Sequence, residues 1–270
     1  MKPLVTALTL LLAICSAAHA QSRQEISYGP DPMQNLDVYL PPNPEAAPIL
    51  VMLHGGAWRI GDKRNRDVWQ SKVTHWLPQG YVFISVNTRL LPDADPVMQA
   101  QDLAMALGFI QQNADRINAD ADRIVLMGHS AGAHVAALLA TRDDIKAAAG
   151  LAPWRGTVLL DTAALDVADM MQDEPAPLYR RAFGSDDAFW RTASPAAHLD
   201  RGDGPFLIVC SSQRYTPCAA AQTFQRDARQ DAVAVVVLPQ NLSHGQVNAQ
   251  LGQPSAYTQA VSGWMNTVLD

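Results

Sequence analysis

A serine flanked by small residues is the part of this chain best suited to chemistry. The run Gly128-His129-Ser130-Ala131-Gly132 follows an apolar stretch that ends at residue 127 and precedes an Ala- and Leu-rich stretch typical of a helix. A serine on a sharp turn between a buried strand and a helix is exposed, and the flanking glycines let strand and helix pass closely. The pattern predicts a nucleophilic Ser130, with an ordinary strand-to-helix turn as the alternative.

A second glycine motif lies earlier in the chain. Residues 48–53 are typical of a buried strand, and His54-Gly55-Gly56-Ala57-Trp58 follows directly. Acyl transfer builds negative charge on a carbonyl oxygen, and backbone N–H groups held in place stabilise that charge. Glycines suit this task because no side chain blocks the substrate. A plain glycine turn is the alternative, and the position of the motif ahead of Ser130 favours the functional interpretation.

Together the two motifs resemble those of the serine esterases of the α/β-hydrolase fold that carry an HGG-type loop. This group includes feruloyl-esterase-like, acetyl-esterase-like and hormone-sensitive-lipase-like proteins. The resemblance covers nearly all of residues 21–270, and it is specific for the fold and the nucleophile but weak for the substrate. It implies that the amides of Gly55, Gly56 and Ala131 bind the oxyanion and that no cofactor or metal is required.

The resemblance also implies a catalytic histidine in the loop after the last strand. Residues 233–238 are the last apolar strand, and the loop 239–245 contains His244. We expect His244 to act as general base toward Ser130 and then as general acid toward the leaving group. The competing histidines are His54, His75, His129, His134 and His198.

The carboxylate that completes the usual triad has no clear place in the sequence. It normally follows the penultimate strand, here 205–209, where Gln213 or Arg214 stands instead. Some relatives carry it after the strand that follows the helix behind the serine. With that strand placed at 146–151, the corresponding residue is Ala152. Neither place therefore offers an Asp or Glu.

Three explanations for the missing acid stay open. The acid comes from elsewhere, for example from the segment Asp161 to Glu174. Alternatively, Ser130 and His244 form a dyad whose imidazole is held by a backbone carbonyl or by Gln213. Finally, the protein has lost hydrolytic activity. Losing the orienting acid costs about 10⁴-fold in turnover in a protease triad and still leaves catalysis above background, so the enzyme interpretation stands.

The first twenty residues are typical of a secretory signal peptide. Lys2 supplies the positive charge, residues 4–14 form the apolar core, and Ala18-His19-Ala20 is a small-x-small cleavage site. The apolar run is too short to span a membrane. We expect cleavage after Ala20 and export to a periplasm or to the outside of the cell.

Export gives a role to Cys210 and Cys218, the two cysteines that remain after cleavage. In an oxidising compartment such a pair favours a disulfide. It would tie the end of a core strand to the next helix, across the loop where the acid is missing. Free thiols are one alternative, and the absence of a nearby His or acid at ligand spacing argues against a metal pair.

Composition and alternation define the expected fold. The chain has 270 residues and a formal net charge of −6, which argues against nucleic-acid binding. Apolar strands alternate with helical stretches, so we expect one α/β domain over 21–270 with a mostly parallel sheet and helices on both faces. All three motifs fall at the carboxyl ends of strands, where such sheets carry their active sites.

The segment 153–200 differs from the rest because it is rich in Asp, Pro and Arg and lacks a clear strand. We expect a small helical cap at about 153–193 that shapes the substrate pocket, with a solvated helical excursion as the alternative. Trp58 and Trp154 are candidates to line that pocket or to pack in the core.

The favoured function is hydrolysis of small-molecule carboxylic esters by an exported serine esterase. An amide hydrolase similar to aryl formamidases is the second enzymatic interpretation. A non-catalytic binding protein of the same fold is the third, because the acid is missing. The sequence does not indicate an oligomeric state.

Overall fold

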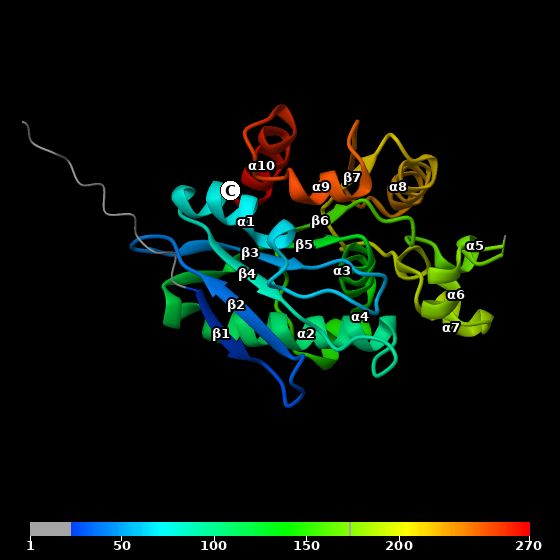
Figure 1. Cartoon of the computed structure of the whole chain (residues 1–270), viewed down its shortest axis with the longest axis horizontal. Coiled ribbons are helices and arrows are strands. Elements are labelled where there is room, and N and C mark those ends of the chain that lie inside the picture. The colour runs from blue at the N-terminus through cyan, green and yellow to red at the C-terminus, as the bar shows by residue number, and fades with distance from the viewer. Residues whose placement is uncertain (1–22, 173) are drawn as a thin grey trace, which may run out of the picture.

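The computed structural model describes residues 23–172 and 174–270, so the predicted signal peptide lies outside the described residues. Eight strands form one sheet in the order β1-β2-β4-β3-β5-β6-β7-β8 (Figure 1). The strands are β1 (Arg23–Ser27), β2 (Asn35–Tyr39), β3 (Ala47–Leu53), β4 (Val82–Val86), β5 (Ala119–His129), β6 (Gly156–Leu160), β7 (Phe206–Ser211) and β8 (Val235–Gln240). Pairing is antiparallel from β1 to β4 and parallel from β4 to β8. This is the α/β-hydrolase architecture that the sequence predicts.

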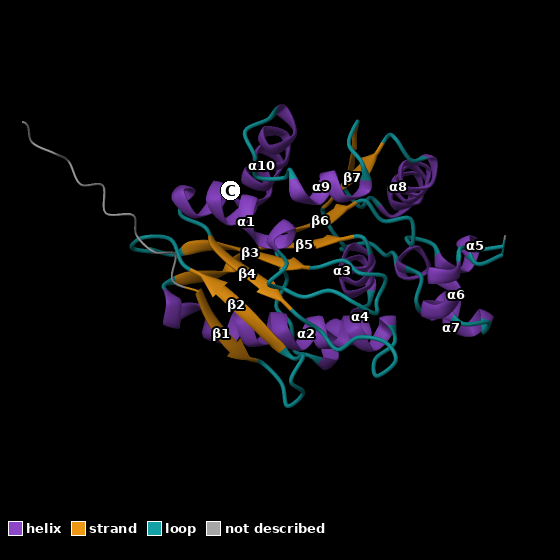
Figure 2. Cartoon of the chain, viewed as in Figure 1, coloured by secondary structure: helices purple, strands orange, loops and turns teal. Residues whose placement is uncertain are grey.

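Helices cover both faces of this sheet (Figure 2). The α-helices are α1 (Arg66–Trp76), α2 (Pro96–Asn113), α3 (Ala131–Thr141), α4 (Asp143–Ala148), α5 (Val167–Met170), α6 (Pro177–Phe183), α7 (Asp187–Thr192), α8 (Tyr215–Ala228), α9 (His244–Ala249) and α10 (Ala256–Leu269). Short 3₁₀ turns are η1 (Leu77–Gln79), η2 (Ala114–Ile117), η3 (Pro195–His198) and η4 (Arg229–Asp231).

The two faces of the sheet carry separate hydrophobic clusters. Successive strand residues point to opposite faces, so in β5 Leu126 packs with the side chains of α2, α3 and α8. Its neighbour Met127 packs with those of α1, α9 and α10. This two-sided burial holds the carboxyl ends of the strands in one rigid row.

The strand predicted at 146–151 is wrong. Asp143–Ala148 is helix α4, which is followed by Gly150 at a φ of 63°. The Ala-rich run favours a helix more strongly than a strand, and the apolar pattern alone does not separate the two over so short a stretch. The strand in this part of the sheet is β6, ten residues later.

The position of β6 also shortens the predicted cap. The sequence analysis expects no clear strand in this part of the chain. Instead, β6 lies within the predicted cap segment 153–193 and pairs with β5 and β7 in the middle of the sheet. The helical part comprises α5, α6 and α7, which lie together at one end of the molecule (Figure 1). A capping role for these helices stays a prediction.

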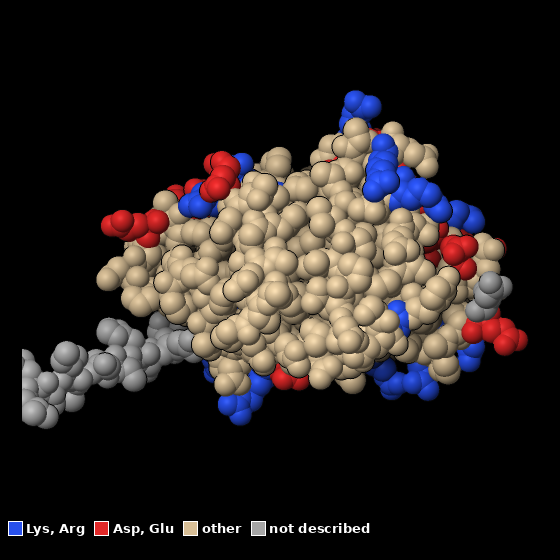
Figure 3. All heavy atoms as spheres, turned by 90° about the horizontal axis from the view of Figure 1, so that it is seen from above, with Lys and Arg blue, Asp and Glu red and all other residues tan. Residues whose placement is uncertain are grey.

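One face of the molecule carries few charges. Residues 232–269, which supply β8, α9 and α10, contain no Lys, Arg, Asp or Glu. The view from above shows charged side chains gathered mainly near the ends of this face (Figure 3). In the described part of the chain no helix is long and apolar enough to cross a membrane.

Candidate active site

Ser130 lies on the sharp turn that the glycine pattern predicts. Its backbone has a φ of 55° and a ψ of −119°, between β5 and α3. A Cβ at Gly128 would collide with the carbonyl of Gly132, and one at Gly132 would collide with the carbonyl of His54. Glycine is required at both positions because strand, turn and helix leave no room for a side chain.

His244 reaches Ser130 from the other side of the turn. It is the first residue of α9, and Ser243 caps this helix in a capping box with Gln246. The Nε2 atom of His244 lies 3.0 Å from Ser130 Oγ, and its Nδ1 atom lies 2.6 Å from Asp161 Oδ2. The three side chains thus form one continuous chain of hydrogen bonds.

Asp161 corrects the prediction that no acid stands at a usual position. It directly follows β6, which is the strand after α3, and so fills the second of the two usual places. The sequence analysis points there to Ala152 because it places the strand at 146–151. Asp161 enters it only as the first residue of an alternative segment. The Ser130 N–H donates to the carbonyl of Leu160 at 2.8 Å, which brings the serine beside the acid.

The Asp161 carboxylate is fully buried and fully partnered. Oδ1 accepts the backbone N–H of Ser211 at 2.7 Å, while Oδ2 accepts from His244 and from Arg214 Nη1, each at 2.6 Å. Burial would raise the pKa of Asp161, but these hydrogen bonds and the Arg214 charge outweigh it and hold the pKa below its ordinary value. Asp161 is therefore ionised at neutral pH.

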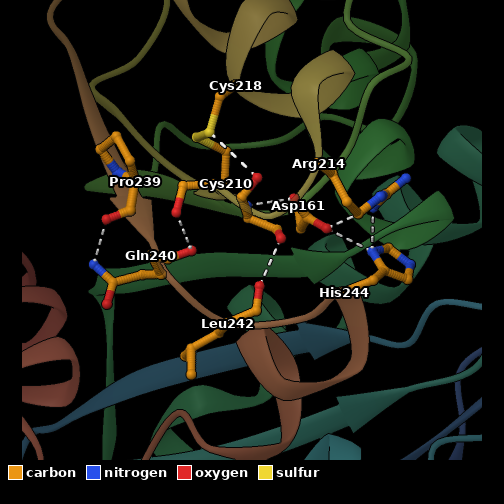
Figure 4. Close-up of a disulfide and its surroundings, with 10 residues drawn as sticks. Asp161, Cys210, Arg214, Cys218, Pro239, Gln240, Leu242 and His244 are labelled. Atoms are coloured by element: carbon orange, nitrogen blue, oxygen red, sulfur yellow. Dashed lines mark hydrogen bonds and ion pairs between the residues drawn. A yellow bond between two sulfur atoms is a disulfide. The ribbon is translucent and has the colours of Figure 1, made fainter.

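Arg214 occupies the first usual place of the acid, at the start of α8 (Figure 4). Its Nη1 atom contacts Asp161 Oδ2 and also lies 2.7 Å from His244 Nδ1. Gln213, the other residue considered for this place, has its side-chain amide on Asn241 at 3.3 Å. A cation, not a carboxylate, therefore stands at the end of β7.

The predicted disulfide joins Cys210 to Cys218 and spans the loop that carries Arg214 (Figure 4). Within this loop the Ser211 hydroxyl donates to the carbonyl of Leu242 at 2.6 Å. The loop after β7 is thereby connected to both the Asp161 carboxylate and the segment that leads to His244. The disulfide therefore restricts the movement of this loop relative to Asp161 and His244.

A cavity of about 500 Å³ opens over Ser130. Its lining residues include Gly55 and Gly56 together with Asp161, Arg214 and His244. Among the described residues, the backbone N–H groups of Gly55, Gly56 and Ala131 have no hydrogen-bond acceptor. These three amides, whose residues line the same cavity as Ser130, are therefore available to bind the negative oxygen that acyl transfer creates.

The tryptophans considered for the pocket differ in position. Trp58 lines the cavity and contacts the rings of His134 and Phe183, whereas Trp154 donates to Thr157 Oγ1 away from it. Trp58 also lies near Tyr179 of α6, which lines the cavity too. The helices beyond β6 thus contribute to the wall of the cavity.

The competing histidines make other contacts. His129 donates from Nε2 to the carbonyl of His244 at 3.0 Å, and burial lowers the pKa of His129 to about 3. His134 accepts from Trp58 and donates to the carbonyl of Ala193. The remaining three contact Gly55 O (His54), Ser262 Oγ (His75) and Thr192 O (His198). In the described ranges only His244 contacts the Ser130 hydroxyl.

Among the described residues, no group of three His, Cys, Asp or Glu side chains is arranged to hold a metal ion.

Curated relatives with esterase names match the chain. Esterase LipQ of Mycobacterium tuberculosis is 26% identical over 269 residues, which cover 93% of this chain and 63% of LipQ. Isoprenylcysteine alpha-carbonyl methylesterase ICME of Arabidopsis thaliana is 35% identical over 119 residues, which cover 43% of this chain and 27% of that protein. The chain thus spans less than two thirds of the length of these relatives.

Solved structures of proteins described as esterases share the fold. A truncated carbohydrate esterase from gut microbiota aligns with a TM-score of 0.78 at 19% identity and covers 94% of this chain and 98% of its own. Esterase B from Lactobacillus rhamnosis aligns with a TM-score of 0.73 at 21% identity, over 93% and 86%. The model of the BD-FAE family matches residues 36–226, more than half of the sequence. The chain therefore belongs to the BD-FAE family.

Proposed function

We propose that this protein hydrolyses carboxylic esters through Ser130, His244 and Asp161. The observation that carries the proposal is the continuous hydrogen-bond chain from Ser130 Oγ through His244 to Asp161 Oδ2, at the floor of an open cavity. The esterase names of the relatives support the same reaction class.

The first half-reaction forms an acyl-enzyme. Ser130 Oγ attacks the ester carbonyl while His244 Nε2 takes its proton, and Asp161 stabilises the imidazolium through Nδ1. The N–H groups of Gly55, Gly56 and Ala131 stabilise the negative charge on the carbonyl oxygen. His244 then protonates the alcohol oxygen, the C–O bond breaks and the alcohol leaves.

The second half-reaction releases the acid. Water attacks the acyl carbonyl, His244 takes the proton of the water, and the same amides hold the second oxyanion. Collapse of this intermediate breaks the bond to Ser130 Oγ, which recovers its proton from His244. Neither half-reaction needs a group beyond the enzyme, the ester and water.

Two further parts of the proposal concern the cap helices and the compartment in which the protein works. Tyr179 and Leu178 of α6 line the cavity beside Ser130, so we assign the helices beyond β6 a role in shaping the pocket. Export fits the Cys210–Cys218 disulfide, because such bonds persist in oxidising compartments. The predicted signal sequence would direct that export.

The decisive experiment measures turnover of p-nitrophenyl acetate, butyrate and octanoate beside the variants Ser130→Ala and His244→Ala. We expect turnover by the unmodified protein and its loss in both variants. Labelling by a fluorophosphonate probe, which reacts only with an activated serine, should follow the same pattern. A protein that neither turns over these esters nor takes the label would instead be a binding protein. Turnover of an aryl formamide with a much higher kcat/KM would identify an amide hydrolase.

A further inference from the structure

Arg214 helps to keep Asp161 ionised, but its contact with His244 has no role in either half-reaction. Its Nη1 atom lies 2.7 Å from His244 Nδ1, and both atoms contact the same oxygen of Asp161. If Nδ1 carries its proton, Nδ1 and Nη1 both donate to Asp161 Oδ2, and the two donor nitrogens crowd each other at 2.7 Å. If Nδ1 instead accepts from Arg214, the proton sits on Nε2, and this tautomer cannot accept the proton of Ser130.

The arginine also weakens the base in the charged state of the reaction. His244 becomes an imidazolium when it takes the serine proton, and the guanidinium would then lie beside it as a second cation. Two positive charges whose nitrogens lie 2.7 Å apart repel each other. Full use of the Asp161–His244 pair therefore requires the guanidinium of Arg214 to move away from Nδ1.

The guanidinium is able to move. The Arg214 side chain is 39% exposed and lines the cavity that contains Ser130. In the described part of the chain its Nε and Nη2 atoms have no hydrogen-bond partner. The backbone of Arg214, in contrast, lies in the loop closed by the Cys210–Cys218 disulfide. Because its backbone is held and part of its guanidinium has no partner, Arg214 is suited to binding a ligand in the cavity.

The order of the strands places Arg214 on the leaving-group side of an ester. Gly55 and Gly56 follow β3, which lies on one side of β5, while β6, β7 and β8 lie on the other side. The carbonyl oxygen therefore points toward β3, and the alcohol oxygen must face His244, which protonates it. Arg214, which follows β7, is on this alcohol side.

We propose that Arg214 recognises a carboxylate on the alcohol part of the ester, and that it moves off His244 Nδ1 when it does so. A guanidinium binds a carboxylate through two parallel N–H donors, which makes it a selective partner for this group. Binding of such a substrate would leave Asp161 Oδ2 to His244 alone. The inference rests on the proposed ester hydrolysis, which defines where the alcohol lies.

The test uses two esters that differ in charge at one position of the leaving group. These are 3-acetoxybenzoate and 3-acetoxybenzamide, which share the acetyl group and the phenol oxygen. We expect the unmodified protein to favour the benzoate in kcat/KM. Arg214→Gln should lower the ratio of the two kcat/KM values at least about tenfold, because a charge-assisted contact is lost. Arg214→Lys should keep part of the ratio.

Arg226→Gln is the matched control, because Arg226 lies on the same helix α8 and its side chain is 69% exposed. It should leave the ratio unchanged. A ratio that is also unchanged in Arg214→Gln, including an equal loss on both esters, overturns the inference and makes Arg214 a residue that only positions Asp161.

A second measurement needs no turnover. In the Ser130→Ala protein, calorimetry should show tighter binding of 3-hydroxybenzoate than of 3-hydroxybenzamide, and Arg214→Gln should remove the difference. If the protein hydrolyses neither ester but keeps this preference, ester hydrolysis fails and the anion site stands. If it hydrolyses both without a charge preference and binds the two phenols equally, the anion site fails and ester hydrolysis stands.

Discussion

The backbone of Ser211 holds the carboxylate of Asp161: the Ser211 N–H donates to Oδ1 at 2.7 Å. The loop after β7, the first of the two usual places of the acid, therefore supplies a donor to an acid that follows β6. This contact leaves Oδ2 for His244 and Arg214. The loop after β7 thus contacts the acid through its backbone and does not itself carry it.

Asp161→Asn should lower kcat by about 10⁴-fold toward p-nitrophenyl esters, with little change in KM. The amide keeps the shape of the side chain but no longer stabilises the imidazolium or fixes the tautomer of His244. Steady-state kinetics on the purified variant measures this. Asp169→Asn, an exposed position on α5, is the control and should retain turnover. A loss below tenfold in Asp161→Asn would support the Ser130–His244 dyad instead.

The fold and two of the three proposed catalytic positions could be predicted because their signals are local. Gly128 and Gly132 are required by crowding at the turn, and His244 follows a strand whose apolar run is clear. The acid could not be placed in the same way, because it depends on which apolar run forms β6. Ala147–Leu151 and Thr157–Leu160 are both short and apolar, and only pairing with β5 and β7 selects the second run.

Arg214 shows a different limit of the sequence. Its position at the end of β7 is visible in the sequence, but its contact with both Asp161 and His244 depends on three separate strand ends meeting. The separation of 53 residues between Arg214 and Asp161 carries no local signal. The signal that the sequence does carry is the type of the residue, since Arg214 is a cation at a place where a carboxylate is usual.

Replacing both cysteines, in Cys210→Ser with Cys218→Ser, should lower the free energy of unfolding by about 2 kcal/mol, because a short loop is no longer closed in the unfolded chain. Urea denaturation checks this value. We also expect a several-fold lower kcat, since the loop that carries Ser211 then holds Asp161 less firmly. The unmodified protein treated with reductant should behave like the variant. Unchanged stability would show that the disulfide does not constrain this loop.

His134 should make stability depend on pH below neutrality. Burial lowers the pKa of His134 to about 4, against a small opposing effect of its hydrogen bond to Ala193. As pH falls from about 6.5 to 4, the unfolded chain binds a proton at this histidine and the folded chain does not, so stability is lost. The stability advantage over His134→Gln should shrink by about 3 kcal/mol across this range. Urea denaturation at pH 7 and pH 4 measures it, and an advantage that is the same at both values would contradict the assignment. Between pH 7 and 8 the advantage should change very little, because the folded chain binds no proton at this histidine and the unfolded chain is mostly unprotonated.

Lys72→Met should destabilise the protein and impair the site at a distance. The buried Lys72 Nζ donates to the carbonyl and the side-chain oxygen of Asn248, both at 2.8 Å, and to the carbonyl of Asp67 at 3.2 Å. Methionine fills the space but leaves these buried oxygens without a donor, which costs about 1–3 kcal/mol. Asn248 lies on α9, the helix that begins at His244, so kcat should fall as well. Arg66→Met, an exposed change on α1, is the control and should alter neither quantity. A Lys72→Met protein with lower stability but full kcat would show that α9 keeps its place without this anchor.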